Sequence, residues 1–166
     1  MNTIINFFEK QLKEEADLTR KMLKIVPEDR YDWQPHPKSM TICRLSTHIA
    51  ELPSWVPLGI NTDVLDFAAG NYQPTLVSSN SELLRLFEEN QKNALDSLSK
   101  TTDEYLQNPW TMKNGDQIFF TITKEDLIRV AISQTIHHRA QLGVFLRLLN
   151  IPIPGTYGPS ADEMGS

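Results

Sequence analysis

Apolar residues recur every three or four positions in four stretches of the chain, the spacing of one face of an α-helix. These stretches cover roughly residues 3–25, 39–55, 79–98 and 124–149. The last has an almost heptad-like inner stripe, formed by Leu127, Ala131, Gln134, His138, Leu142, Phe145 and Leu149. We therefore expect four helices that bury their apolar faces against one another.

Local signals mark the ends of these helices. Pro27 ends the first, because proline cannot continue the backbone hydrogen-bond ladder, and Pro53 and Pro57 should kink or end the second. Ser79 and Glu82 are spaced as a capping box at the start of the third helix. The helical segments are thus bounded as separate elements.

The connections carry other signals. Residues 56–78 form a long crossover, in which we expect a short helix around residues 62–69. Asn114 and Gly115 separate two β-favouring runs, which predicts a hairpin. The proline-rich chain from about residue 151 to 166 should be irregular. The predicted fold class is all-α, a four-helix bundle with long crossover connections and a small β-hairpin between helices 3 and 4, in a single domain spanning residues 1–166.

The composition narrows the location and the partners. Hydrophobic residues make up 40% and charged residues 22% of the chain, as in soluble globular proteins. The net charge of -5 argues against a nucleic-acid partner, and no apolar run is long enough to span a membrane. The N-terminus lacks the pattern of a signal peptide. The only cysteine, Cys43, excludes an intramolecular disulfide, and we interpret it as a buried apolar residue in a cytoplasmic protein.

Three polar residues stand on the predicted inner stripes. His48 lies between apolar residues of the second helix, and Gln134 and His138 lie one turn apart on the fourth. Each buried polar group needs a partner, since leaving one unsatisfied costs about 1–3 kcal/mol. One divalent metal bound by all three would satisfy them and keep positions open for water or substrate. Alternatively, the three side chains form a polar layer that is held together by hydrogen bonds.

The remaining candidates have weaker support. Glu51, one turn after His48, could act as a general base, as an extra ligand or as a partner for Arg139 or another cation. His137 points about 100° away from His138, which favours a structural, interface or second-shell role. Arg139 and Arg147 are expected to face away from the stripe, and His36 to pack within a loop. The chain contains none of the common nucleophile, phosphate-loop or zinc-protease motifs.

Four segments of the chain resemble the DinB family of bacterial four-helix-bundle proteins. They are Asp32 to Met40, Leu45 to Pro53, His137 to Leu142 and Tyr157 to Glu163. The resemblance implies a homodimer that holds a divalent metal (Zn, Ni or Mn) through three histidines, at the positions of His48, Gln134 and His138. Gln134 departs from that pattern, and an amide oxygen binds zinc or nickel more weakly than an imidazole does.

The resemblance also suggests activities, because some members of the family are metal-dependent thiol transferases and one is a thiol-dependent maleylpyruvate isomerase. We expect a metal-dependent transferase that joins a low-molecular-weight thiol to a small electrophile, with Glu51 as a candidate base. The alternative is a non-catalytic dimeric bundle with a degenerate metal site, such as a stress protein that binds a small ligand. A DNA-binding regulator is the third hypothesis, and no basic helix supports it.

Overall fold

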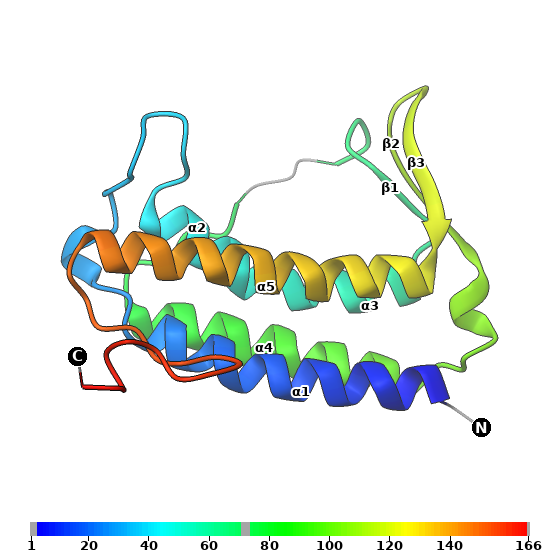
Figure 1. Ribbon diagram of the computed structural model, residues 1–166. Coiled ribbons are helices and arrows are strands. Elements are labelled where there is room, and N and C mark those ends of the chain that lie inside the picture. Colours follow the sequence, from blue (N-terminus) through cyan, green and yellow to red (C-terminus); the bar gives the residue numbers. More distant parts are fainter. Residues whose placement is uncertain (1–2, 71–73, 166) are drawn as a thin grey trace.

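The computed structural model describes residues 3–70 and 74–165, and its helices lie side by side with a small sheet at one end (Figure 1). The helical elements, including three short 3₁₀ turns (η), are α1 (Thr3–Lys24), η1 (Glu28–Arg30), α2 (Ile42–Glu51), η2 (Leu52–Ser54), α3 (Trp55–Asn61), α4 (Asn80–Leu98), η3 (Tyr105–Gln107) and α5 (Lys124–Leu148). The strands are β1 (Val64–Asp66), β2 (Pro109–Asn114) and β3 (Gln117–Thr123). The predominantly helical class with a small hairpin is therefore confirmed.

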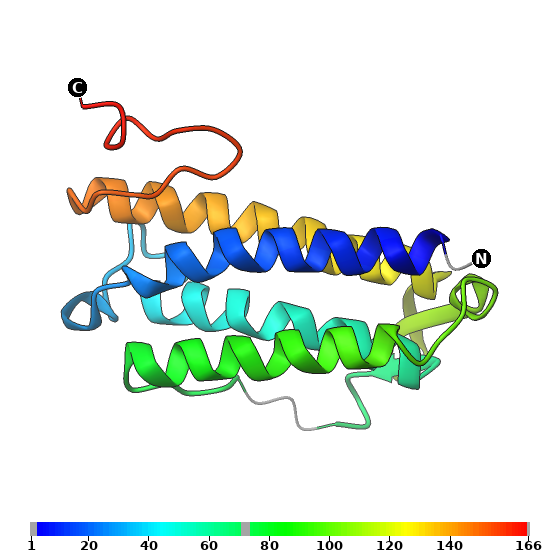
Figure 2. The ribbon, with the colours of Figure 1, turned by 90° about the horizontal axis from the view of Figure 1, so that it is seen from below.

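Helix α1 packs against α4 and α5, and the segment formed by α2, η2 and α3 packs against the same two helices (Figure 2). Pro53 lies in η2 and Pro57 in the first turn of α3, where a missing backbone N–H costs little. The prolines thus lie where α2 ends and α3 begins, in a segment that stays packed against α4 and α5. The predicted capping box at the start of α4 is half formed, because the Ser79 hydroxyl accepts from the Glu82 amide and the Glu82 carboxylate accepts from Ser78.

The apolar interior forms two clusters along the helices. One contains Leu23, Ile49 and Phe87, near the end of the molecule where α1 ends. The other contains Val56 and Ile128 and lies nearer the sheet. Together they fix the rotation of every long helix, and this rotation decides which polar side chains meet.

The sheet has the order β1-β2-β3, with β1 parallel to β2 and β2 antiparallel to β3. The predicted hairpin is confirmed, and Gly115 in its turn has φ +59°, which glycine adopts without strain. The short helix expected around residues 62–69 is wrong. The chain is already helical in α3, and residues 64–66 then pair with β2. The Asp66 carboxylate accepts the Gly115 amide and fixes this third strand to the hairpin.

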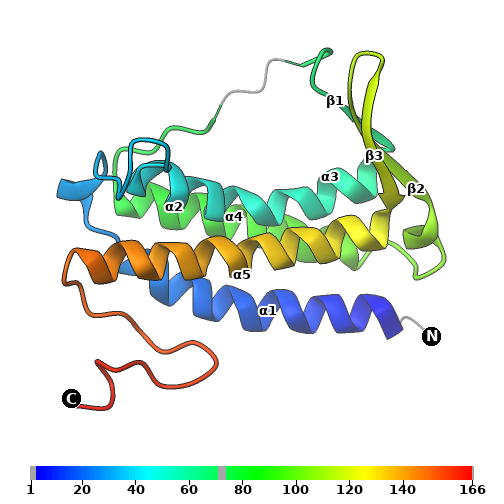
Figure 3. The same cartoon turned by 45° about the horizontal axis from the view of Figure 1, so that its top comes forward.

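The tail after α5 is irregular, as predicted, and folds back beside α1 and α5 (Figures 2 and 3). Asn150 leaves the helix with φ 57°, which reverses the chain direction. The Asp162 carboxylate accepts the Ile153 amide and pairs with Arg147, so the tail is fastened to itself and to α5. Within residues 3–70 and 74–165, no helix is long and apolar enough to cross a membrane.

Candidate functional site

His48 of α2 and His138 of α5 meet where these two helices pack against each other. Their ring centroids are 4.7 Å apart, with the rings edge to face, and both residues are half-buried. Burial lowers the pKa of both imidazoles, and the proximity of His138 lowers the pKa of His48 further. The two rings are therefore neutral at pH 7, the form that binds a metal.

A hydrogen bond orients His138. Its Nδ1 atom lies 2.7 Å from Oε1 of Gln141, one turn further along α5. Because an amide oxygen only accepts, Nδ1 carries the proton, and Nε2 keeps its lone pair for another partner. Metal-binding histidines commonly have this arrangement, in which one ring nitrogen donates to a carbonyl and the other is the ligand.

Gln134 lies one turn before His138 but is exposed to solvent. Its expected position on an inner stripe is therefore wrong. The buried face of α5 is formed by Lys124, Leu127, Ile128, Ala131, Ile132, Thr135, Arg139, Leu142, Gly143 and Leu146. A strict seven-residue repeat drifts about 20° per heptad on a straight helix, so it does not follow this face over 25 residues. Gln134 instead lies on the exposed side of α5.

His137 is exposed, and its ring contacts His138 at a centroid distance of 4.9 Å. Its position agrees with the expectation that it points away from the interior. The rings of His48 and His137 both contact the ring of His138. The nitrogen atoms of the three rings nevertheless do not point to one common position where a metal could lie. Across the described part of the chain, no three side chains of His, Cys, Asp or Glu are placed to hold one metal ion. A metal here would need the two inner imidazoles plus a weaker ligand such as the Gln134 amide oxygen.

Glu51 is held in an ion pair rather than left free as a base. Its Oε2 atom lies 3.0 Å from Nη1 of Arg44, and its Oε1 atom accepts the Thr75 amide at 2.9 Å. Burial opposes its ionisation, but these hydrogen bonds prevail and lower the pKa of Glu51. The partner is Arg44 and not Arg139, and the lowered pKa makes Glu51 a poor proton acceptor.

A cavity of about 620 Å³ adjoins His48. Its apolar lining comes from Trp55 and Leu58 of α3, Leu65 and Phe67 in and after β1, and Leu86 of α4. Sequence reasoning missed this cavity, because its wall is completed by β1, which the pattern did not predict. His48 therefore stands beside a space large enough for a small molecule.

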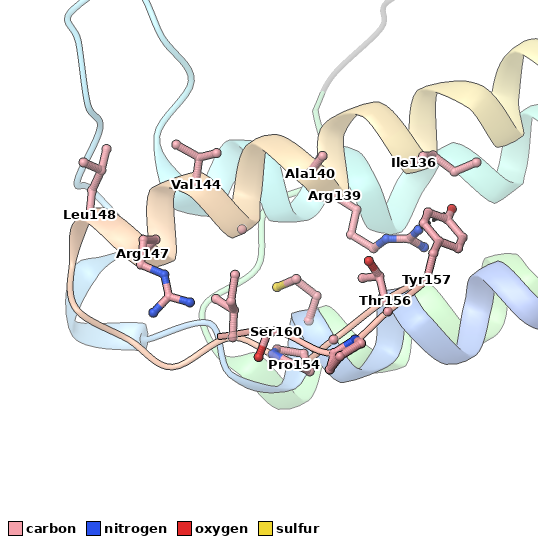
Figure 4. Close-up of a pocket in the computed structure, with 16 residues that line it drawn as sticks. Ile136, Arg139, Ala140, Val144, Arg147, Leu148, Pro154, Thr156, Tyr157 and Ser160 are labelled. Atoms are coloured by element: carbon pink, nitrogen blue, oxygen red, sulfur yellow. Dashed lines mark hydrogen bonds between the residues drawn. The ribbon is translucent and has the colours of Figure 1, made fainter. Parts of the chain in front are cut away.

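The prediction that Arg139 faces away from the interior is wrong. Its guanidinium is buried, forms an ion pair with Glu15 at 2.7 Å and donates to Thr19 and to the hydroxyl of Tyr157. It lines a second cavity of about 450 Å³ between α5 and the tail (Figure 4). Arg147, the other arginine of that cavity, is exposed as expected and pairs with Asp162.

The other candidate residues have local roles. His36 is exposed, and its Nδ1 atom accepts the Lys38 amide within the same turn. Cys43 is half-buried, with its sulfur 3.9 Å from the Val77 carbonyl oxygen. Burial raises the pKa of this thiol, so less of it is in the nucleophilic thiolate form at neutral pH.

Comparisons with known proteins identify the family. The sequence profile of the DinB family matches residues 1–165. The chain belongs to the DinB family. It is also similar to the uncharacterized protein YrdA of Bacillus subtilis (strain 168), with 26% identity over 169 residues, which cover 96% of this chain and 91% of that protein.

Solved structures of DinB-like proteins share the fold. One from Bacillus cereus has a TM-score of 0.74 at 20% identity and covers 95% of this chain and 100% of its own. The DinB-like protein YjoA of Bacillus subtilis has a TM-score of 0.68 at 17% identity, covering 90% and 96% of the two chains. A putative DinB family member from Exiguobacterium sibiricum has a TM-score of 0.65 at 17% identity, covering 93% and 97%. At these identities the likeness extends to the fold alone.

Proposed function

We propose that this DinB-family protein binds a divalent metal through His48 and His138 and transfers a low-molecular-weight thiol to a small electrophile. The observation that carries the proposal is the pair of neutral imidazoles in contact at 4.7 Å, one of which is oriented by Gln141. We further propose that the protein is a cytoplasmic homodimer of four-helix bundles, as the family resemblance implies.

The donor set fits a metal with an incomplete protein shell. Two imidazoles supply strong ligands, and the exposed amide of Gln134 stands one turn from His138 as a weaker oxygen donor. Zinc, nickel or manganese would fit these donors, with the amide oxygen best suited to manganese. A shell with so few protein ligands leaves positions open for a thiol or for water.

The roles of the residues follow from their geometry. A metal bound there would supply the positive charge that favours a thiolate over a thiol. Gln141 holds the ring of His138, and the apolar cavity beside His48 excludes water and positions the electrophile. In the overall reaction, the thiolate sulfur forms a bond to the electrophilic carbon, the leaving group departs with its bonding electrons, and the thiol proton passes to solvent. Glu51 stays ionised against Arg44 and holds Thr75 in place, so we assign it a positioning role rather than that of a base.

A second candidate is a non-catalytic protein of the same fold that binds a small ligand, for example in a stress response. The exposed Gln134 favours it, together with the absence of a three-residue His, Cys, Asp or Glu cluster in residues 3–70 and 74–165. In that case the cavity beside His48 would be the binding site, without a reaction.

Calorimetric titration of chelator-treated protein with zinc, nickel and manganese tests the metal. We expect binding tighter than about millimolar, weakened at least about tenfold in His48→Ala and in His138→Ala and unchanged in the loop variant His36→Ala. Protein loaded with the metal that binds should then accelerate conjugation of glutathione or cysteine to 1-chloro-2,4-dinitrobenzene, and His48→Ala and His138→Ala should not. Failure of all three metals to bind would leave only the non-catalytic candidate.

A further inference from the structure

The cavity beside His48 has a chemical character that selects its occupant. We infer that it binds the aromatic, amine-bearing part of a small molecule and rejects carboxylic acids. Calling that molecule the electrophilic substrate rests on the proposed function, whereas the binding preference rests on the cavity alone.

The walls of the cavity are mainly apolar. Trp55 and Phe67 contribute aromatic rings, and Leu58, Leu65 and Leu86 contribute aliphatic side chains. A volume of about 620 Å³ lies within the range of pockets that enclose small organic ligands. Aromatic walls also attract cations through the negative faces of their rings, which adds to the affinity for an ammonium group.

The charged groups of the lining have one sign. Glu51 and Asp66 line the cavity, and none of the described residues around it is a lysine or an arginine. Arg44 and Lys113 pair with these carboxylates from outside the lining. An ammonium group in the cavity would therefore meet carboxylate oxygens, whereas a carboxylate would lose its hydration and find no cation in contact.

Asn90 adds a hydrogen-bond acceptor. Its Nδ2 atom donates to the Ala50 carbonyl at 2.9 Å, which fixes the orientation of the amide. Its Oδ1 atom is an acceptor, so an N–H group of a ligand in the cavity could donate to it. A ligand with N–H donors thus matches both the carboxylates and the amide oxygen.

The other cavity, between α5 and the tail, lacks this kind of selectivity. Arg139 and Arg147 line it (Figure 4). They are already in ion pairs with Glu15 and Asp162. Among the described residues, its lining holds no aspartate or glutamate, so an ammonium group would find no carboxylate there. The cavity beside His48 differs in its carboxylates, Glu51 and Asp66, although these are paired as well.

Three naphthalene probes of the same skeleton test the inference on metal-free protein: 1-naphthylmethylamine, 1-naphthamide and 1-naphthoate, which are cationic, neutral and anionic at pH 7.5. We expect calorimetry to show the amine binding most tightly, the amide next and the acid at least about tenfold more weakly than the amine. Naphthoate binding as tightly as the amine, or no binding of the amine, would overturn the inference.

Variants place the bound probe in the cavity. Leu58→Trp fills the space and should abolish amine binding, and Asn90→Leu should weaken amide binding about fivefold, as the loss of one hydrogen bond does. Asn93→Leu, on an exposed position of the same helix, is the matched control and should bind as wild type does. Circular dichroism verifies that each variant is folded. Unchanged amine binding in folded Leu58→Trp would contradict the site.

The outcome is independent of the metal. If metal titration fails while the amine binds, the proposed reaction falls and the ligand preference stands. If metal binds but the probes bind equally whatever their charge, the ligand preference is wrong and the proposed metal site stands.

Discussion

Arg139 and Glu15 form an ion pair between α5 and α1 with both side chains almost fully buried, at 3% and 9% exposure. The guanidinium also donates to the Glu15 carbonyl oxygen and to Thr19. The hydroxyl of Tyr157 donates to the same carboxylate at 2.8 Å and accepts from Arg139. Residues from the first helix, the last helix and the tail are thereby tied at one buried point.

Breaking this pair from one side should destabilise the fold strongly. We expect Arg139→Ala to lower the free energy of unfolding by about 3–5 kcal/mol, because it leaves a buried carboxylate without its cation. The double variant Arg139→Met with Glu15→Met should cost less than the single one, since no lone charge remains. Urea unfolding measures both, with exposed Arg129→Ala as the control on the same helix. A single variant as stable as the double would contradict this account.

The same pair shows where the sequence pattern misleads. Arg139 was expected to face away from the inner stripe of the last helix, and the pattern did not single out Lys124, yet both belong to the buried face. Their partners come from distant parts of the chain. Arg139 pairs with Glu15 of α1, and Lys124 binds Gly59 of α3 and Thr62, which follows α3. Periodicity treats each side chain by its own polarity, so it cannot detect that a charge is satisfied by a residue over 60 positions away.

Lys124 makes a second test of a buried charge. Its ammonium group is fully buried, donates to Gly59 O at 2.8 Å and to Thr62 O, and pairs with Asp63. It thus binds the carbonyls at the end of α3 to the start of α5. We expect Lys124→Met to reduce stability by about 2–3 kcal/mol, because charged hydrogen bonds are lost and buried carbonyls stay unpaired.

Thermal and urea unfolding check this loss, and exposed Lys100→Met serves as the matched control with little effect. Equal stability of the two variants would show that water replaces the ammonium group at no cost.

Local signals predicted local structure well. Asn114 and Gly115 gave the hairpin, and Pro53 and Pro57 gave the break between α2 and α3. Strand β1 was missed because a three-residue strand has no period to detect, and it exists only by pairing with residues 111–113. That pairing completes the wall of the cavity beside His48, so the histidines were found from the sequence while the space next to them was not.

The stability of the folded tail should depend on pH. The hydrogen bond from Arg147 has the largest effect on Asp162, followed by that from the Ile153 amide. Together they lower the pKa of Asp162 to about 2. An unpaired aspartate has a pKa of about 3.9, so this carboxylate stabilises the folded tail above that pH. The stabilisation is lost as the pH falls from there through 2, because the proton neutralises the group that Arg147 holds.

Carboxyl carbon-13 NMR should therefore show Asp162 still mostly ionised at pH 3. Arg147→Gln should move its midpoint up toward the ordinary aspartate value, whereas Arg129→Gln on the same helix should not. A midpoint near 4 in the wild type would show that the tail does not hold this pair in solution.

Substitutions of Gln141 test whether the orientation of the His138 ring matters, while the ring itself stays in place. Gln141→Leu removes the acceptor of the Nδ1 proton, so the ring loses its fixed tautomer. We expect metal affinity by calorimetry to fall about 10–100-fold, with the fold unchanged by circular dichroism. Gln141→Glu retains an acceptor oxygen and should restore the affinity. Leucine and glutamate variants of equal affinity would remove Gln141 from the site.

Gln134→His decides between an attenuated metal site and a degenerate one. The new imidazole would stand one turn from His138 on the exposed side of α5, and it would replace a weak oxygen donor with a strong nitrogen donor. We expect zinc affinity to rise at least about tenfold over wild type. Ser133→His, an exposed neighbour about 100° round the helix, should give no such rise. Binding by Gln134→His with none in wild type would assign this chain to the non-catalytic reading. Equal binding by both would show that His48 and His138 hold the metal with the amide or water, and that an imidazole at position 134 is dispensable here.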